Sequence, residues 1–125
     1  MLTLKTVILE CPDVRRLLSF YQALLGWPIA FDEGEFVRIE CPETGMGIAF
    51  QLEEDYEPPV WPTERGRQQM MAHLDFGVSD LAELRAMADR ALSLGATAAP
   101  TQYSDEDWLT LLDPAGHPFC LVIWG

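Results

Sequence analysis

The side chains able to do chemistry in this 125-residue chain are few. It contains two histidines and three cysteines, and the odd number of cysteines, without CxxC spacing, predicts reduced thiols rather than disulfides or a structural zinc knuckle. His73 stands two residues before Asp75. In a strand these two side chains share a face, so the carboxylate can orient the imidazole or contact a ligand. His117 lies in the turn DPAGHP, where a local hydrogen bond or exposure to solvent is expected.

Several function classes are disfavoured by composition. The sequence has no glycine-rich phosphate loop, no Ser-His-Asp arrangement and no HExxH motif. Eight basic against twenty acidic residues give a net charge of -12, which argues against nucleic acid and anionic membranes as partners. The apolar start MLTLKTVILECPD is interrupted at Pro12, too early for a signal peptide or a membrane span, so a cytoplasmic protein is expected.

The elements that must position these residues are organised as an internal repeat. CPDVRRLLSFYQALLG predicts an amphipathic helix between an N-cap at Asp13 and a stop at Gly26. SDLAELRAMADRALSLG predicts a second helix between Asp80 and Gly95, with Asp80 and Glu83 spaced as a capping pair. Adding 67 to apolar positions 14, 17, 21, 24 and 25 of the first helix gives positions 81, 84, 88, 91 and 92 of the second.

Strands are predicted around both helices. One precedes each helix, in LKTVILECPD and MAHLDFGVSD, and three follow it, in PIAFDE, EFVRIE and GIAFQLEE, and in ATAAPTQ, DWLTLLD and PFCLVI. We therefore expect an α+β fold in which residues 1–125 form one domain of two βαβββ modules, about 1–53 and 70–125, joined by a linker over 54–69. The modules should associate with helices outside and a concave mixed sheet that can bind a small ligand. The two modules can pair within one chain or be exchanged between two chains, and the sequence leaves both arrangements open.

Four motifs in this layout, HLDFGV, FYQALLGW, PPVWP and DPAGHPFCL, resemble those of the vicinal oxygen chelate superfamily. That superfamily includes glyoxalase I, extradiol dioxygenases and the fosfomycin and bleomycin resistance proteins, and the resemblance is closest to its glyoxalase-like subgroup. It covers essentially the whole chain and implies a homodimer that binds a small organic molecule. Because this scaffold hosts lyases, isomerases, oxygenases and binding proteins alike, the resemblance leaves the reaction open.

The resemblance also implies four metal-ligand positions, which in glyoxalase I type enzymes hold His or Gln, Glu, His and Glu. Carried over to this chain, they fall on Thr6, Gln51, His73 and Cys120. A threonine hydroxyl and a neutral amide are weak ligands, and an amide cannot act as a general base. The remaining pair, His73 and Cys120, needs a third donor. Asp75 is an awkward one, since same-face neighbours on a strand lie about 7 Å apart.

No metal cofactor is therefore expected; if zinc, nickel, manganese or iron binds, His73 and Cys120 are the expected ligands. Without metal, His73 is interpreted as a hydrogen-bonded residue lining the cavity, with acid/base catalysis as the candidate catalytic role. Cys120 is interpreted as a small buried residue of a core strand. Trp61 is either a lid over the cavity or a plug for the linker. The candidate ligand-binding residues are Thr6, Gln51, Trp61, His73, Asp75 and Cys120.

The leading hypothesis is a glyoxalase-like protein that binds a small organic molecule between its modules without the full divalent-metal site. The alternative is a metal-dependent lyase, isomerase or dioxygenase with a reduced ligand set centred on His73. A third possibility is a dimeric interaction module whose cavity is filled by side chains. Whether catalysis follows binding is left open.

Overall fold

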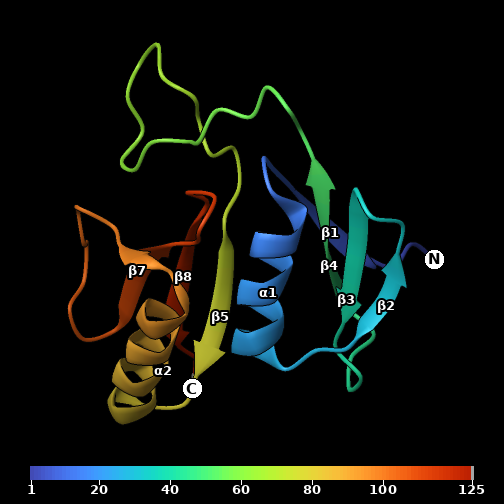
Figure 1. Ribbon diagram of the computed structural model, residues 1–125. Coiled ribbons are helices and arrows are strands. Elements are labelled where there is room, and N and C mark those ends of the chain that lie inside the picture. Colours follow the sequence, from blue (N-terminus) through green and yellow to red (C-terminus); the bar gives the residue numbers. More distant parts are fainter. Residues whose placement is uncertain (125) are drawn as a thin grey trace. The chain divides into compact units, whose positions relative to one another are not determined.

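A computed structural model describes residues 1–124; Gly125, the last residue of the expected second module, lies outside the described residues. The chain divides into two units, the first spanning Met1–Tyr56 and the second beginning at Glu57. Each unit repeats one order of elements, strand, helix and three strands, which confirms the predicted α+β fold with two βαβββ modules (Figure 1). The first contains β1 Thr6–Cys11, α1 Val14–Leu25, β2 Ile29–Asp32, β3 Phe36–Glu40 and β4 Gly47–Leu52. The second contains β5 Leu74–Val78, α2 Leu81–Leu94, β6 Thr97–Ala98, β7 Trp108–Leu112 and β8 Pro118–Ile123.

The two sheets have the same topology. The strand order is β1-β4-β3-β2 in one and β5-β8-β7-β6 in the other. In each, the first strand runs parallel to the last one, and the other neighbours are antiparallel. The last strand of each module therefore lies beside the first, which places the ends of the module's sequence on neighbouring strands.

Both helices begin and end at the predicted caps. The Asp13 carboxylate accepts a hydrogen bond from the Arg16 amide at 3.1 Å, and Gly26 ends α1 with φ 70°. The Asp80 carboxylate accepts one from the Glu83 amide at 2.8 Å. The Glu83 carboxylate bonds Ser79 instead of the cap residue, so only half of a capping box forms.

Aromatic contacts identify the helix-covered face of each sheet. Tyr21 of α1 stacks on Phe50 of β4 at 5.6 Å between ring centroids, so Phe50 faces α1. In the second module Phe119 pairs with Leu74 as Ile48, on the same face as Phe50, pairs with Val7, so the buried Phe119 and its edge-to-face neighbour Phe76 lie on the helix-covered face. Because side chains alternate along a strand, the neighbours of these residues point to the opposite face of each sheet. That face carries the candidate site residues.

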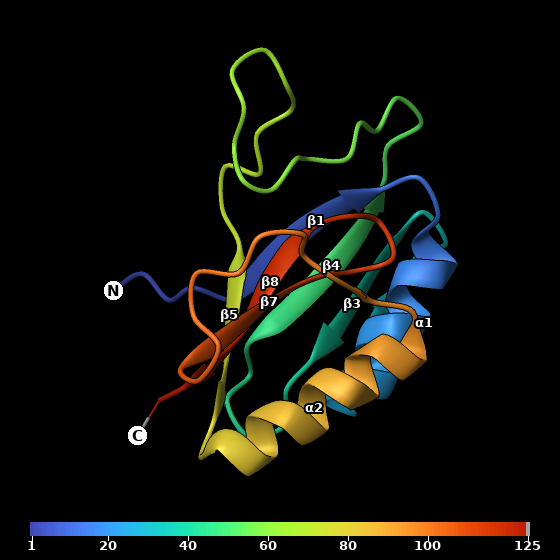
Figure 2. The same cartoon turned by 90° about the vertical axis from the view of Figure 1, so that its left-hand side faces the viewer.

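The predicted strand over 96–102 is much shorter in the structure, where β6 covers only Thr97–Ala98. Pro100 has no amide hydrogen and cannot extend the ladder. In Figure 2, α2 runs alongside the strands of its own sheet. A cavity of about 250 Å³ remains between α2 and the short β6, lined among others by Leu92 and Leu111. Leu92, predicted on the apolar stripe, is accordingly 42% exposed.

The predicted linker contains neither helix nor strand, and the irregular segment continues to His73 (Figure 2). Among residues 1–124 no helix combines the length and the apolar character that crossing a bilayer requires.

Candidate functional site

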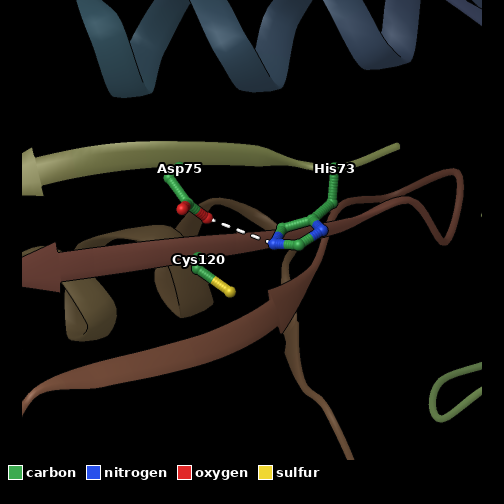
Figure 3. A group of neighbouring side chains, drawn as sticks. All are labelled: His73, Asp75 and Cys120. Carbon is green, nitrogen blue, oxygen red and sulfur yellow. Dashed lines mark ion pairs between the residues drawn. The ribbon is translucent and has the colours of Figure 1, made fainter.

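Three potential ligand atoms converge on the second module's sheet, on the face opposite α2 (Figure 3). His73 immediately precedes β5, Asp75 lies on β5, and Cys120 is the residue of β8 that pairs with Asp75. One ligand atom from each residue, a ring nitrogen, a carboxylate oxygen and Sγ, lies within 4.8 Å of the other two. His73 Nε2 and Asp75 Oδ1 are 3.2 Å apart. The fold thus brings together an imidazole, a carboxylate and a thiol.

The polar atoms of His73 and Asp75 lie much closer together than the spacing of about 7 Å expected along a strand, and the carboxylate is placed to orient the imidazole, as expected. The strand rise separates the two backbones, but the side chains lean toward one another until their polar atoms touch (Figure 3). His73 lies just outside the regular strand, so its direction is not set by the pleat. Both side chains are about one-third exposed, so a solvent-borne ligand can reach them.

Cys120 is the buried member of the group, as predicted, with 4% of its surface exposed. Its Sγ lies 3.3 Å from the Thr110 hydroxyl. Burial raises the pKa of the Cys120 thiol, the Thr110 hydrogen bond opposes that rise, and the nearby Asp75 carboxylate adds to it. Cys120 is therefore a protonated thiol at neutral pH unless a cation replaces the proton, which argues against a role as a free nucleophile.

Trp61 lies beside this group. Its ring is 5.8 Å from that of His73 and 5.9 Å from that of Tyr103, edge to face in both cases. The indole nitrogen donates to the Thr101 carbonyl at 3.0 Å, which fixes the ring. Trp61 thus anchors the linker segment against the second module. Tyr103 was missed from the sequence because it stands in an irregular polar segment, TQYSDED, with no periodicity to assign it a face.

The first module shows a different arrangement at the corresponding positions. Leu74 pairs with Phe119 as Val7 pairs with Ile48, so His73, Asp75 and Cys120 correspond to Thr6, Ile8 and Ala49. The resemblance points to Gln51, which lies one same-face position beyond Ala49 and is exposed. The roles of Thr6 and Gln51 in ligand binding stay predictions.

Arg38 of β3 occupies the face beside Thr6, and sequence reasoning missed it. Its Nε donates to the Thr6 hydroxyl at 2.7 Å, and its guanidinium also bonds the Glu40 carboxylate at 2.6 Å and the Lys5 carbonyl at 3.0 Å. A Cβ at position 47 would overlap this guanidinium, so Gly47 leaves room for it. A charged residue in the middle of a predicted strand was the available signal, but its partner on β1 follows only from the strand order.

His117 is used locally, as predicted. Its amide donates to the buried Asp113 carboxylate at 3.0 Å, and its Nδ1 lies 2.8 Å from the same carboxylate. These contacts close the turn between β7 and β8.

Residues 6–122 match the model of the family described as "Glyoxalase-like domain". The chain belongs to this family. No curated protein sequence matches the glyoxalase-like chain at a significant level.

Solved structures share this glyoxalase-like fold at low identity. A protein of Agrobacterium tumefaciens solved by NMR aligns with TM-score 0.75 and 20% identity, over 100% of this chain and 99% of its own. A glyoxalase/bleomycin resistance protein/dioxygenase family enzyme of Burkholderia phytofirmans aligns with TM-score 0.72 and 18% identity, over 94% and 95%. A mutant of the fosfomycin resistance protein FosX of Listeria monocytogenes, complexed with Mn(II) and a dihydroxypropylphosphonic acid, aligns with TM-score 0.74 and 15% identity, over 100% and 92%. At these identities the similarity establishes the fold alone.

Proposed function

We propose that this glyoxalase-like protein binds a divalent metal ion of the zinc class through His73, Asp75 and Cys120 and holds a small organic molecule there. The observation that carries the proposal is the convergence of three ligand atoms within 4.8 Å on one sheet face. It supports the metal-dependent alternative of the sequence interpretation, now with Asp75 as the missing third donor.

The donor set fits such an ion chemically. Imidazole nitrogen, thiolate sulfur and carboxylate oxygen are all zinc ligands, and three protein ligands with an open position are typical of catalytic rather than structural zinc sites. Thiolate and carboxylate together would neutralise a dication. When bound, the ion would polarise a ligand oxygen or activate a water molecule.

The chain's own residues have distinct tasks in this proposal. Without an ion, His73 Nε2 and Asp75 Oδ1 satisfy one another, so the exposed edge of the site does not depend on metal for its shape. Cys120 contributes its sulfur from the buried side. Trp61, held by Thr101, gives the site an apolar wall against which an organic molecule can pack.

A metal-free binding protein is the second candidate, supported by the same contact. The His73–Asp75 pair already forms without an ion, and an imidazole oriented by a carboxylate can hydrogen-bond an organic ligand directly. Either proposal includes four further expectations. The chain forms a single domain of two modules, it is cytoplasmic, it forms a homodimer, and Thr6 and Gln51 take part in ligand binding. They rest on the sequence pattern and on family resemblance.

Metal analysis separates the two candidates. The purified protein is incubated separately with zinc, nickel, manganese and iron(II), dialysed, and its metal content measured by elemental analysis. We expect close to one zinc per chain in the wild type and in the matched control His117→Gln, and background levels in His73→Ala. Retention of no metal by the wild type would favour the metal-free binder. Retention that survives His73→Ala would place the ion elsewhere.

A further inference from the structure

We infer that Thr110 is a positioning residue of this site, whose hydroxyl donates a hydrogen bond to the Cys120 thiolate and holds Sγ toward His73 and Asp75. The inference rests on the proposed metal site and extends it to a residue outside the ligand set.

The contact is enclosed and directional. Thr110 of β7 and Cys120 of β8 are cross-strand partners, with Oγ1 and Sγ 3.3 Å apart. Thr110 is 0% exposed and Cys120 4% exposed, so water cannot easily replace the hydroxyl. Either atom can donate in the thiol form. A thiolate has no proton, so ligation of a metal by Cys120 leaves Thr110 as the donor.

The backbone of Thr110 is fixed from the side opposite to β8. The Gln102 side chain accepts from the Thr110 amide at 2.9 Å and donates to the Thr110 carbonyl at 2.7 Å. It also donates to the Ala99 carbonyl at 3.1 Å. The Ala99 amide donates to the same Thr110 carbonyl at 3.1 Å, so Gln102 supplies the partner of the Thr110 amide that β6, which ends at Ala98, does not provide. The hydroxyl is consequently carried by a residue whose backbone amide and carbonyl both have partners, which is what orienting a metal ligand requires.

The first module has a hydrogen-bonding side chain at the position that corresponds to Thr110, on the face opposite the helix. Cys120 corresponds to Ala49, and the cross-strand partner of Ala49 on β3 is Arg38. Thr110 and Arg38 therefore occupy corresponding places, and each is hydrogen-bonded to a side chain on this face: Arg38 donates to the Thr6 hydroxyl, and the Thr110 hydroxyl bonds the Cys120 sulfur. Arg38 brings a positive charge there, whereas Thr110 brings a neutral donor that is compatible with a bound cation.

Removing the hydroxyl should weaken metal binding without removing a ligand. Thr110→Val keeps the shape, and loss of a hydrogen bond to a metal ligand typically lowers metal affinity by about 10–100-fold. Thr110→Ser restores the donor and should recover most of the affinity. Thr97→Val, which removes an exposed hydroxyl from β6, is the matched control and should bind as the wild type does.

Co(II) titration tests the inference through its spectrum as well as its affinity. A thiolate bound to Co(II) gives a charge-transfer band, and a hydrogen bond to sulfur stabilises the sulfur lone pairs and moves that band to higher energy. We expect the band to shift to lower energy in Thr110→Val and to return in Thr110→Ser. A structural role alone would not move it. Thermal melts check that each variant folds. If Thr110→Val does not fold, the affinity and band position of Thr110→Ala are compared with those of Thr110→Ser instead.

The outcomes separate the two proposals. Failure of wild-type protein to bind Co(II) or zinc overturns the metal site itself, and the role of Thr110 with it. Wild-type binding with unchanged affinity and band position in folded Thr110→Val overturns the role of Thr110 and leaves the metal site standing.

Discussion

The two modules share one fold and differ in what their sheets present on the face opposite the helix. In the second module that face carries His73 and Asp75, whose polar atoms meet at the surface above a buried thiol. In the first, the corresponding strand carries Thr6 and Ile8, and the hydroxyl of Thr6 is occupied by Arg38. The second module thus brings an imidazole, a carboxylate and a thiol together on this face, whereas in the first module a guanidinium bonds the hydroxyl at the corresponding position.

The difference shows how a duplicated fold can keep its backbone and change its chemistry at single positions. Strand pairing depends on the backbone amides and carbonyls, so side chains on the face opposite the helix can change without altering the register. A guanidinium on that face disfavours a second cation nearby, because like charges repel strongly where water is partly excluded. Arg38 thus gives the first module a network of one ion pair and several hydrogen bonds that involves the positions corresponding to His73 and Thr110.

Giving the second module the residue of the first should have the largest effect. Asp75→Ile installs the side chain that the first module carries at this position, and it removes one of three proposed ligands. We expect zinc affinity to fall by more than about 100-fold, since loss of a residue that only hydrogen-bonds a ligand already costs about 10–100-fold. Isothermal titration with zinc measures this.

The control is Ile8→Val, a conservative change at the corresponding position of the first module, which should leave zinc binding unchanged. Equal zinc affinity in Asp75→Ile and wild type would mean that Asp75 is not a ligand and that the two modules do not differ in the way described.

Removing Arg38 should destabilise the first module and leave metal binding alone. Arg38→Met keeps the apolar stem but leaves the half-buried Thr6 hydroxyl and the Glu40 carboxylate without their shared partner. Hydrogen bonds to charged groups are worth about 1.5–3 kcal/mol, and partial exposure reduces this, so we expect unfolding free energy to fall by about 1–2 kcal/mol. Urea denaturation measures the change.

Arg15→Met is the matched control, because Arg15 pairs with Asp32 at the exposed surface. Its loss should lower stability less than loss of Arg38. If both variants unfold at the same urea concentration, the network around Arg38 is no stronger than a surface ion pair.

Sequence reasoning predicted the elements well because their signals are local. The caps at Asp13 and Asp80, the glycine stops and the 67-residue offset of the apolar stripe all follow from neighbouring residues. The strand predicted over 96–102 is too long, because Pro100 cannot extend the ladder and Gln102 bonds Thr110 through its side chain, which no periodicity signals.

The candidate site was only partly predictable. His73 and Cys120 were found through family resemblance, and Asp75 through strand alternation, but the joint position of all three depends on parallel pairing between β5 and β8. Thr110 and Arg38 lie next to candidate site residues only because their strands pair with β8 and β4. Long-range register of this kind is set by the fold as a whole, so one sequence leaves it open.

The smallest expected difference between the modules concerns their thiols. Cys41 of the first module is partly exposed, and its pKa is lowered chiefly by the Thr44 hydroxyl and then by the Thr44 and Glu43 amides. Burial raises the pKa of Cys120. Because the thiolate is the nucleophile, iodoacetamide at pH 8 should modify Cys41 first, and modification of Cys120 should begin only as pH rises above the ordinary thiol value of about 8.5. Mass spectrometry of timed samples measures both rates. Thr44→Val should slow modification of Cys41 and Thr44→Ser should not, whereas equal rates at both cysteines would contradict the difference in burial and hydrogen bonding.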